Sequence, residues 1–235
     1  MPTKVASEDI ICYFRAHGLG FERTQITTDP RDIEGRRLSK LPPKWVRATE
    51  TQGSDGLALL WGELAHGFGN FFQSLLDHNK GFALMEVNGK WTLLYLLEVN
   101  GNLELLFGAP PLALSSTLHP DWALLPEDFR MFYYVHTRLA DRDQVFPFWG
   151  PQSNWGKLSQ LLPKDEWPDS WRAHELNPVR CLVVGDDGAG THLCFQLTKS
   201  PLTPSRPFLW NASGEIRLVD NLLAELDRDY SLFPF

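Results

Sequence analysis

Residues 82–107 read FALMEV-NG-KWTLLYLLEV-NG-NLELLF, and this stretch decides the fold. Three runs rich in apolar and aromatic side chains, 82–87, 90–99 and 102–107, are separated by two Asn-Gly pairs. Asn-Gly tolerates the positive φ angles of the tight hairpin turn whose twist matches its flanking strands. The stretch therefore predicts a meander of three antiparallel strands, which Ala-Pro-Pro at 109–111 ends.

An amphipathic helix is predicted before the meander, over residues 57–78. Leucine and phenylalanine recur there at three- and four-residue spacing, and Ser54 or Asp55 can cap its start. Three glycines, at positions 62, 67 and 69, each weaken a helix by about 1 kcal/mol relative to alanine. We expect them to let another element approach closely.

Residues 113–235 predict a second helix, two hairpins and a closing helix. Pro126 suits the first turn of the second helix, and Glu127 and Asp128 complement the positive end of its dipole. The other expected elements are a short helix near 157–162, strands at 179–184 and 192–198 around the glycine-rich turn 185–190, a hairpin of 207–210 with 215–219, and a helix at 220–229. Residues 22–50 and most of 141–178 are expected to be irregular.

These elements predict an α+β fold, in which a mostly antiparallel sheet has helices packed on it. We expect two parts: residues 1–112, with a locally basic arm, the first helix and the meander, and a domain at 113–235. Whether the first part is a separate module or extends the same sheet stays open at this point.

Composition narrows the class of protein. The 235 residues include 22 basic and 29 acidic ones, which gives a net charge of −7, and 43% are hydrophobic. Such a chain can bury a core, and its acidity argues against a general nucleic-acid binder. A basic group at 36–47 offers a local nucleic-acid patch as the weaker alternative, because acidic residues nearby offset it.

The sequence also predicts where the protein resides. No run reaches the roughly 18 apolar residues that span a bilayer, so we expect no membrane contact. The first residues carry acids where a signal peptide needs basic residues. The three cysteines are too few and odd in number for a disulfide scaffold, which favours a cytoplasmic location.

Motifs for catalysis are weak, so we predict no enzyme, no cofactor and no metal. Three patterns could carry chemistry: a Glu-x-x-His step at Glu63, the glycine-rich turn 185–190 as a phosphate or calcium site, and Cys181 with His174 or His192 as a nucleophile and base. The favoured interpretations are a surface pair, a plain turn and an inert buried thiol. His136 is expected to be a hydrogen-bonded residue at the edge of the core.

Tryptophans gather in the irregular segment, at positions 149, 155, 167 and 171. Large rings can form the core of a region poor in regular structure, and this interpretation is favoured. The alternative is a binding surface, since tryptophan is frequent among the residues that dominate protein interfaces.

The order of motifs in residues 113–235 resembles the SUKH superfamily. LPEDFRMFY at 125–133 resembles its helix entry, VGDDGAGTHLCF at 184–195 its acidic-glycine turn and following strand, and PFLWN at 207–211 its next hairpin, with the closing helix in the same order. This superfamily includes bacterial toxin-immunity proteins and fungal regulators of cell-wall assembly. The resemblance implies an α+β domain without catalytic residues that recognises other proteins.

What the resemblance implies is an immunity protein that binds a cognate toxin and blocks it. An acidic protein would meet a basic toxin quickly, because complementary charge raises the association rate. The residues expected to contact the toxin are Asp141, Asp143, Asp186, Asp187 and Glu215, with Trp149 or Trp155 as an apolar anchor. The alternatives are an adaptor or chaperone for a secreted effector, and an enzyme of unrecognised type.

Overall fold

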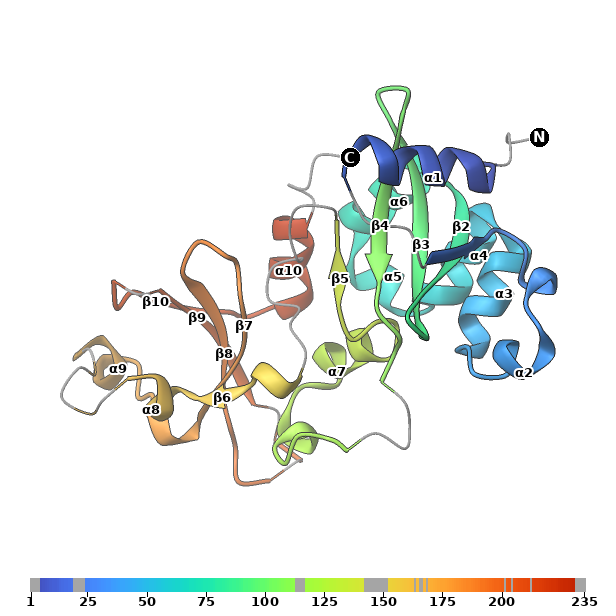
Figure 1. Cartoon of the computed structure of the whole chain (residues 1–235). Coiled ribbons are helices and arrows are strands. Elements are labelled where there is room, and N and C mark those ends of the chain that lie inside the picture. Colours follow the sequence, from blue (N-terminus) through green and yellow to red (C-terminus); the bar gives the residue numbers. More distant parts are fainter. Residues whose placement is uncertain are drawn as a thin grey trace.

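The computed structural model describes residues 5–18, 24–112, 117–141, 152–162, 164, 167, 169–200, 202–203, 205–211 and 213–230. Within these residues the chain forms an α+β fold with two antiparallel five-stranded sheets (Figure 1). The predicted fold class is therefore confirmed, and its strands are divided between two sheets.

The first sheet is built around the predicted meander, which is confirmed. Across the sheet its strands are β1 (Thr24–Thr27), β2 (Asn79–Val87), β3 (Lys90–Val99), β4 (Asn102–Gly108) and β5 (Leu139–Ala140). Asn88 and Asn100 both have a φ of 52°, and the glycine after each has a φ of 78°. These are the left-handed conformations that a tight Asn-Gly hairpin turn requires.

Strand β3 is buried on both faces, which explains its nearly continuous apolar sequence. Tyr95 and Leu97 belong to the large core, whereas Leu94 and Leu96 pack in a second cluster with α1 (Ser7–Ala16). The large core lies on the side of helices α3 (Pro43–Thr51), α4 (Gly53–Trp61), α5 (Leu64–Gly67) and α6 (Gly69–His78). Alternate residues of a strand point to opposite faces of its sheet. The sheet is thus covered by α1 on one face and by α3 to α6 on the opposite face (Figure 1).

The single helix predicted over 57–78 is wrong, because three helices occupy this region. They are α4 (Gly53–Trp61), α5 (Leu64–Gly67) and α6 (Gly69–His78). Gly62 has a φ of 52° and a ψ of −128°, a conformation open to glycine that ends α4. A Cβ at Gly67 would lie 2.4 Å from Leu223 Cδ1, so the expected close approach of another element does occur there.

The irregular arm predicted over 22–50 is also wrong. Besides β1 it holds the short helices η1 (Pro30–Asp32) and α2 (Gly35–Leu38) and the longer α3 (Pro43–Thr51). Pro43 stands at the first position of α3, where its missing N–H costs no helical hydrogen bond. In the basic group, Arg37 forms an ion pair with Glu86 and lies over the Trp91 ring.

The second sheet contains the two hairpins predicted in residues 179–219, which are confirmed. Its order is β10 (Ile216–Leu218), β9 (Arg206–Asn211), β8 (Thr191–Gln196), β7 (Cys181–Asp186) and β6 (Gly156–Lys157). The predicted helices near 127, 158 and 222 correspond to α7 (Glu127–Tyr133), α8 (Leu158–Leu161) and α10 (Leu222–Tyr230). Among the described residues, helices also lie in segments where none is predicted: α9 (Asp169–Ala173), η2 (Trp122–Leu124), η3 (Gln152–Asn154) and η5 (Pro178–Arg180).

Buried contacts cross the predicted division at residue 112, which itself stays a prediction. One core cluster contains side chains from both parts, among them Phe71, Phe132 and Phe195. Strand β5, from the second part, pairs with β4 of the first sheet. Asp227 in α10 accepts hydrogen bonds from the backbone N–H groups of Asn70 (3.1 Å) and Phe71 (2.8 Å), at the start of α6. Helix α10 thus caps a helix of the other part.

None of the helices among the described residues has the length and apolar character needed to cross a bilayer.

Candidate functional site

Two hairpin turns lie side by side at one end of the second sheet. The β7–β8 turn ends at Thr191 and the β9–β10 turn begins at Asn211, and these two residues pair across β8 and β9. The first turn carries Asp186 and Asp187, and the second carries Glu215. The register therefore brings together three of the acidic residues predicted from the sequence.

Hydrogen bonds within the β7–β8 turn hold its carboxylates in place. Asp186 Oδ1 accepts from the Gly188 N–H (2.9 Å), and Asp187 Oδ1 accepts from the N–H groups of Ala189 and Thr191 (both 2.8 Å). Partial burial alone would raise the pKa of Asp187, but the hydrogen bonds from Thr191 and Ala189 outweigh it and lower that pKa. Both side chains are therefore fixed acceptors, and Asp186 is exposed.

The β9–β10 turn is held by a similar local network. Asn211 Oδ1 accepts from the Glu215 N–H (3.0 Å), and Asn211 Nδ2 donates to Glu215 Oε2 (3.2 Å). Ser170 of α9 donates to the Gly214 carbonyl (2.7 Å), which ties the turn to the helix. Glu215 is exposed, so its charge is presented to solvent.

The other predicted contact residues do not lie at this end. Asp141 follows β5 in the first sheet and is half-buried. Asp143 and Trp149 lie outside the described residues. Trp155 is 7% exposed and stacks on Trp122, with ring centroids 5.9 Å apart. The ring is part of the core, so the predicted role of Trp155 as an apolar anchor does not fit its burial. Its burial agrees with the favoured interpretation, in which the tryptophan rings form the core of this region.

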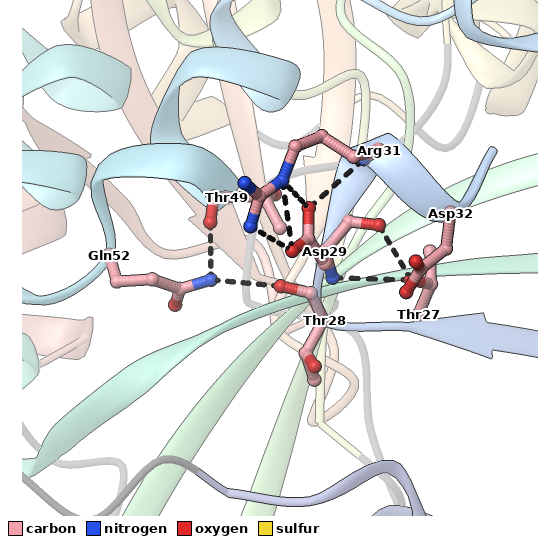
Figure 2. Close-up of polar contacts among 7 residues, drawn as sticks. All are labelled: Thr27, Thr28, Asp29, Arg31, Asp32, Thr49 and Gln52. Atoms are coloured by element: carbon pink, nitrogen blue, oxygen red, sulfur yellow. Dashed lines mark hydrogen bonds and ion pairs between the residues drawn. The ribbon is translucent and has the colours of Figure 1, made fainter.

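A polar pocket that the sequence analysis missed lies between β1 and the end of α3 (Figure 2). Its volume is about 430 Å³, and its walls are Thr28, Asp29, Arg31, Thr49, Glu50 and Gln52. Asp29 accepts from Arg31 Nε (2.9 Å) and Nη2 (2.5 Å), so these two of the three charged side chains at the pocket largely satisfy each other, and Glu50 is the third. The Asp-Pro pair at 29–30 is a turn signal, but nothing in the sequence places it against α3.

Gln52 is the strained residue of this pocket. Its φ of 61° and ψ of 175° fall in a region that is almost restricted to glycine. Its side-chain amide accepts from the Phe82 N–H (2.6 Å) and donates to the carbonyls of Thr28 (3.4 Å) and Thr49, as Figure 2 shows for the latter two. Gln52 therefore links the residue after β1, the end of α3 and Phe82 of β2 through hydrogen bonds, and these bonds offset its backbone strain.

His136 is fully buried in a chain of hydrogen bonds, as expected from its interpretation as a structural residue. Its Nδ1 donates to the Ala109 carbonyl (2.9 Å), which leaves Nε2 to accept from the Tyr95 hydroxyl (2.6 Å). Trp61 Nε1 in turn donates to Tyr95 Oη (3.2 Å). Burial lowers the pKa of His136 to about 4, although the bond to Ala109 opposes this shift. A neutral ring without solvent access is a structural group.

The thiols and the acidic residues do not assemble a reactive centre among the described residues. Burial raises the pKa of Cys181 to about 12 and also raises that of Cys194, so both thiols stay protonated. No group of three or more His, Cys, Asp or Glu side chains in this part of the chain is arranged to hold a metal ion.

Comparison with known proteins gives no match: no family model, curated protein or solved structure was found to be similar to the chain. The resemblance to the SUKH superfamily therefore stays a prediction from the order of its motifs.

Proposed function

We propose that this chain is a non-enzymatic protein-binding module that neutralises a basic toxic protein by direct contact, as the resemblance to SUKH immunity proteins implies. The observation that supports the proposal is the pair of neighbouring turns carrying Asp186, Asp187 and Glu215. Neither turn contains a basic residue. This end of the second sheet is hence the candidate contact surface.

The carboxylates of the β7–β8 turn are held in fixed positions, and this favours binding. A side chain already held by hydrogen bonds loses less conformational entropy on contact with a partner than a free one does. Asp186 and Asp187 are fixed by backbone N–H groups of their own turn. A basic toxin would therefore meet a fixed pattern of negative charge, which raises the association rate and discriminates against acidic proteins.

The test uses a basic toxic effector encoded beside this protein. Purified chain should bind the effector and abolish its activity, and the variant Asp186→Asn/Glu215→Gln should associate about tenfold more slowly at low salt because steering charge is lost. Asp55→Asn/Glu63→Gln is the matched control, since it also removes two negative charges and both side chains are exposed on the other part of the chain. It should leave the association rate unchanged.

Two results would count against the proposal. If Asp186→Asn/Glu215→Gln and Asp55→Asn/Glu63→Gln slow association equally, the two turns are not the contact surface. If the effector binds without losing activity, the protein acts as an adaptor or chaperone and not as an inhibitor.

A further inference from the structure

Ser39 follows a pair of arginines at the end of the short helix α2. Residues 36–39 read Arg-Arg-Leu-Ser, and no other serine or threonine of the chain has arginines both two and three positions before it. Ser39 is exposed, and its hydroxyl donates to the Arg36 carbonyl (3.0 Å). Serine kinases with carboxylates in their peptide-binding groove select arginines at these positions, because guanidinium groups pair with carboxylates. The hydroxyl is therefore accessible beside a recognition pattern for such an enzyme.

The fold holds this segment loosely. Helix α2 is a single turn, none of its residues is buried, and Leu38 packs only partly on the large core. The ion pair of Arg37 with Glu86 is partly exposed, and such pairs contribute little to stability. An isolated helical turn is marginally stable in water, so the segment can open locally and enter a kinase active site in an extended form.

The surroundings of Ser39 are suited to a phosphate. Residues 35–49 contain five basic residues and no acidic one, although the whole chain has a net charge of −7. Arg36 and Lys40 are exposed and make no ion pair with the described residues. The nearest acidic residue in sequence, Glu34, stands at the other end of α2. A phosphoserine carries a charge of about −1.5 to −2 and three acceptor oxygens, which neighbouring cations stabilise.

We propose that Ser39 is a phosphorylation site for an arginine-directed serine kinase, and that Arg36 and Lys40 hold the resulting phosphate. The Ser39 oxygen attacks the γ-phosphorus of ATP, and the bond between that phosphorus and the ADP oxygen breaks as the new O–P bond forms. The hydroxyl proton passes to a carboxylate of the kinase, and nothing is oxidised or reduced. This site does not depend on the proposed function, because it uses neither acidic turn.

The test is incubation of the full chain with ATP and the catalytic subunit of cyclic-AMP-dependent protein kinase, with mass spectrometry to locate the phosphate. Ser39 should be phosphorylated and Ser54 should not. Ser54 is the matched serine, since it is also exposed but has no basic residue among the three before it. Arg36→Gln should slow the reaction at least about tenfold, because a charged hydrogen-bonded pair with the kinase is lost. Arg47→Gln removes an exposed arginine outside the recognition positions and should leave the rate unchanged.

Phosphorus NMR of the phosphorylated chain tests the second half of the proposal. Positive neighbours favour the dianion, so the second ionisation of the phosphate on Ser39 should have a pKa below the usual value of about 6. Lys40→Gln, phosphorylated in the same way, should raise this pKa again. Arg47→Gln is the control here as well and should not change it.

The inference is overturned if Ser39 stays unmodified while an Arg-Arg-Ala-Ser peptide is phosphorylated in the same mixture, or if Arg36→Gln reacts as fast as Arg47→Gln. Equal phosphorylation of Ser39 and Ser54 would show that exposure, and not the arginines, selects the serine. A phosphate pKa of about 6 that Lys40→Gln does not change would show that the two cations do not hold the phosphate. Circular dichroism checks that the variants fold.

Discussion

Replacing Asp227 by alanine should destabilise the whole protein and not only the closing helix. The carboxylate is 7% exposed and accepts three hydrogen bonds, from the Asn70 N–H, the Asn70 side-chain amide (2.8 Å) and the Phe71 N–H. Two of the donors are backbone groups in the first turn of α6, which have no partner within the helix. Asp227→Ala therefore removes a cap and leaves donors of α6 unpaired.

The magnitude follows from these contacts. Loss of an N-cap side chain costs about 0.5–2 kcal/mol, and the buried Phe71 N–H left unpaired adds about 1–3 kcal/mol, whereas water can pair with the groups of the exposed Asn70. Release of a buried carboxylate to solvent offsets part of this cost. We expect a net loss of about 3 kcal/mol, which for a chain of this size lowers Tm by about 6–12 °C. Asp227→Asn keeps one acceptor oxygen and should cost about half as much.

The assay is urea unfolding followed by tryptophan fluorescence and by circular dichroism. Asp220→Ala is the matched control, because Asp220 is exposed just before the same helix, and it should change the free energy of unfolding by less than about 0.5 kcal/mol. If Asp227→Ala is no more destabilising than this control, the cap on α6 is not a stabilising contact. If only the α10 signal is lost in an early transition, the two parts do not unfold as a unit.

Three other predictions concern buried groups. The pKa of His136 is about 4 and that of an exposed histidine about 6.5, so the unfolded state takes up the proton first as the pH falls. The free energy of unfolding should therefore decrease as the pH drops between these values. His136→Asn should reduce this pH dependence in urea titrations at pH 7 and pH 5, and an unchanged dependence would contradict the assignment. A Cβ at Gly108 would lie 2.3 Å from His136 Cε1, so Gly108→Ala should lower the free energy of unfolding by about 1–3 kcal/mol, whereas Gly35→Ala, with open space around it, should be nearly neutral. Gln52→Gly loses the side-chain hydrogen bonds but relieves backbone strain, so its free energy of unfolding, measured in urea, should exceed that of Gln52→Ala by about 1 kcal/mol. The reverse order would show that the strain is not there.

The strand arrangement could be predicted where the signal is local. The Asn-Gly pairs at 88–89 and 100–101 define their turns by residue type, so the meander follows from neighbours in sequence. Helix α3 was missed because its Pro-Pro start and its charges are typical of a loop. Its helical character rests on the burial of Trp45, Ala48 and Thr49 against the sheet, which is a tertiary effect.

The sequence predicts the residues of the candidate site but not how they are arranged in space. Asp186, Asp187 and Glu215 were each expected in a loop, but their common location depends on the pairing of β8 with β9. The burial of Trp155 depends on its contacts with side chains distant in sequence, such as Trp122. The strained backbone of Gln52 carries no sequence signal at all, since glutamine has no preference for that conformation.

The contact between Asp227 and the start of α6 joins residues 157 positions apart, and this has a consequence for synthesis on the ribosome. The first sheet and its helices emerge long before the chain that completes them. Until α10 leaves the exit tunnel, α6 lacks its carboxylate partner and the space beside Gly67 lacks its leucine. Nascent chains of this protein would therefore be most exposed to proteases and chaperones in that interval, and gain the stability of these contacts only once α10 has emerged.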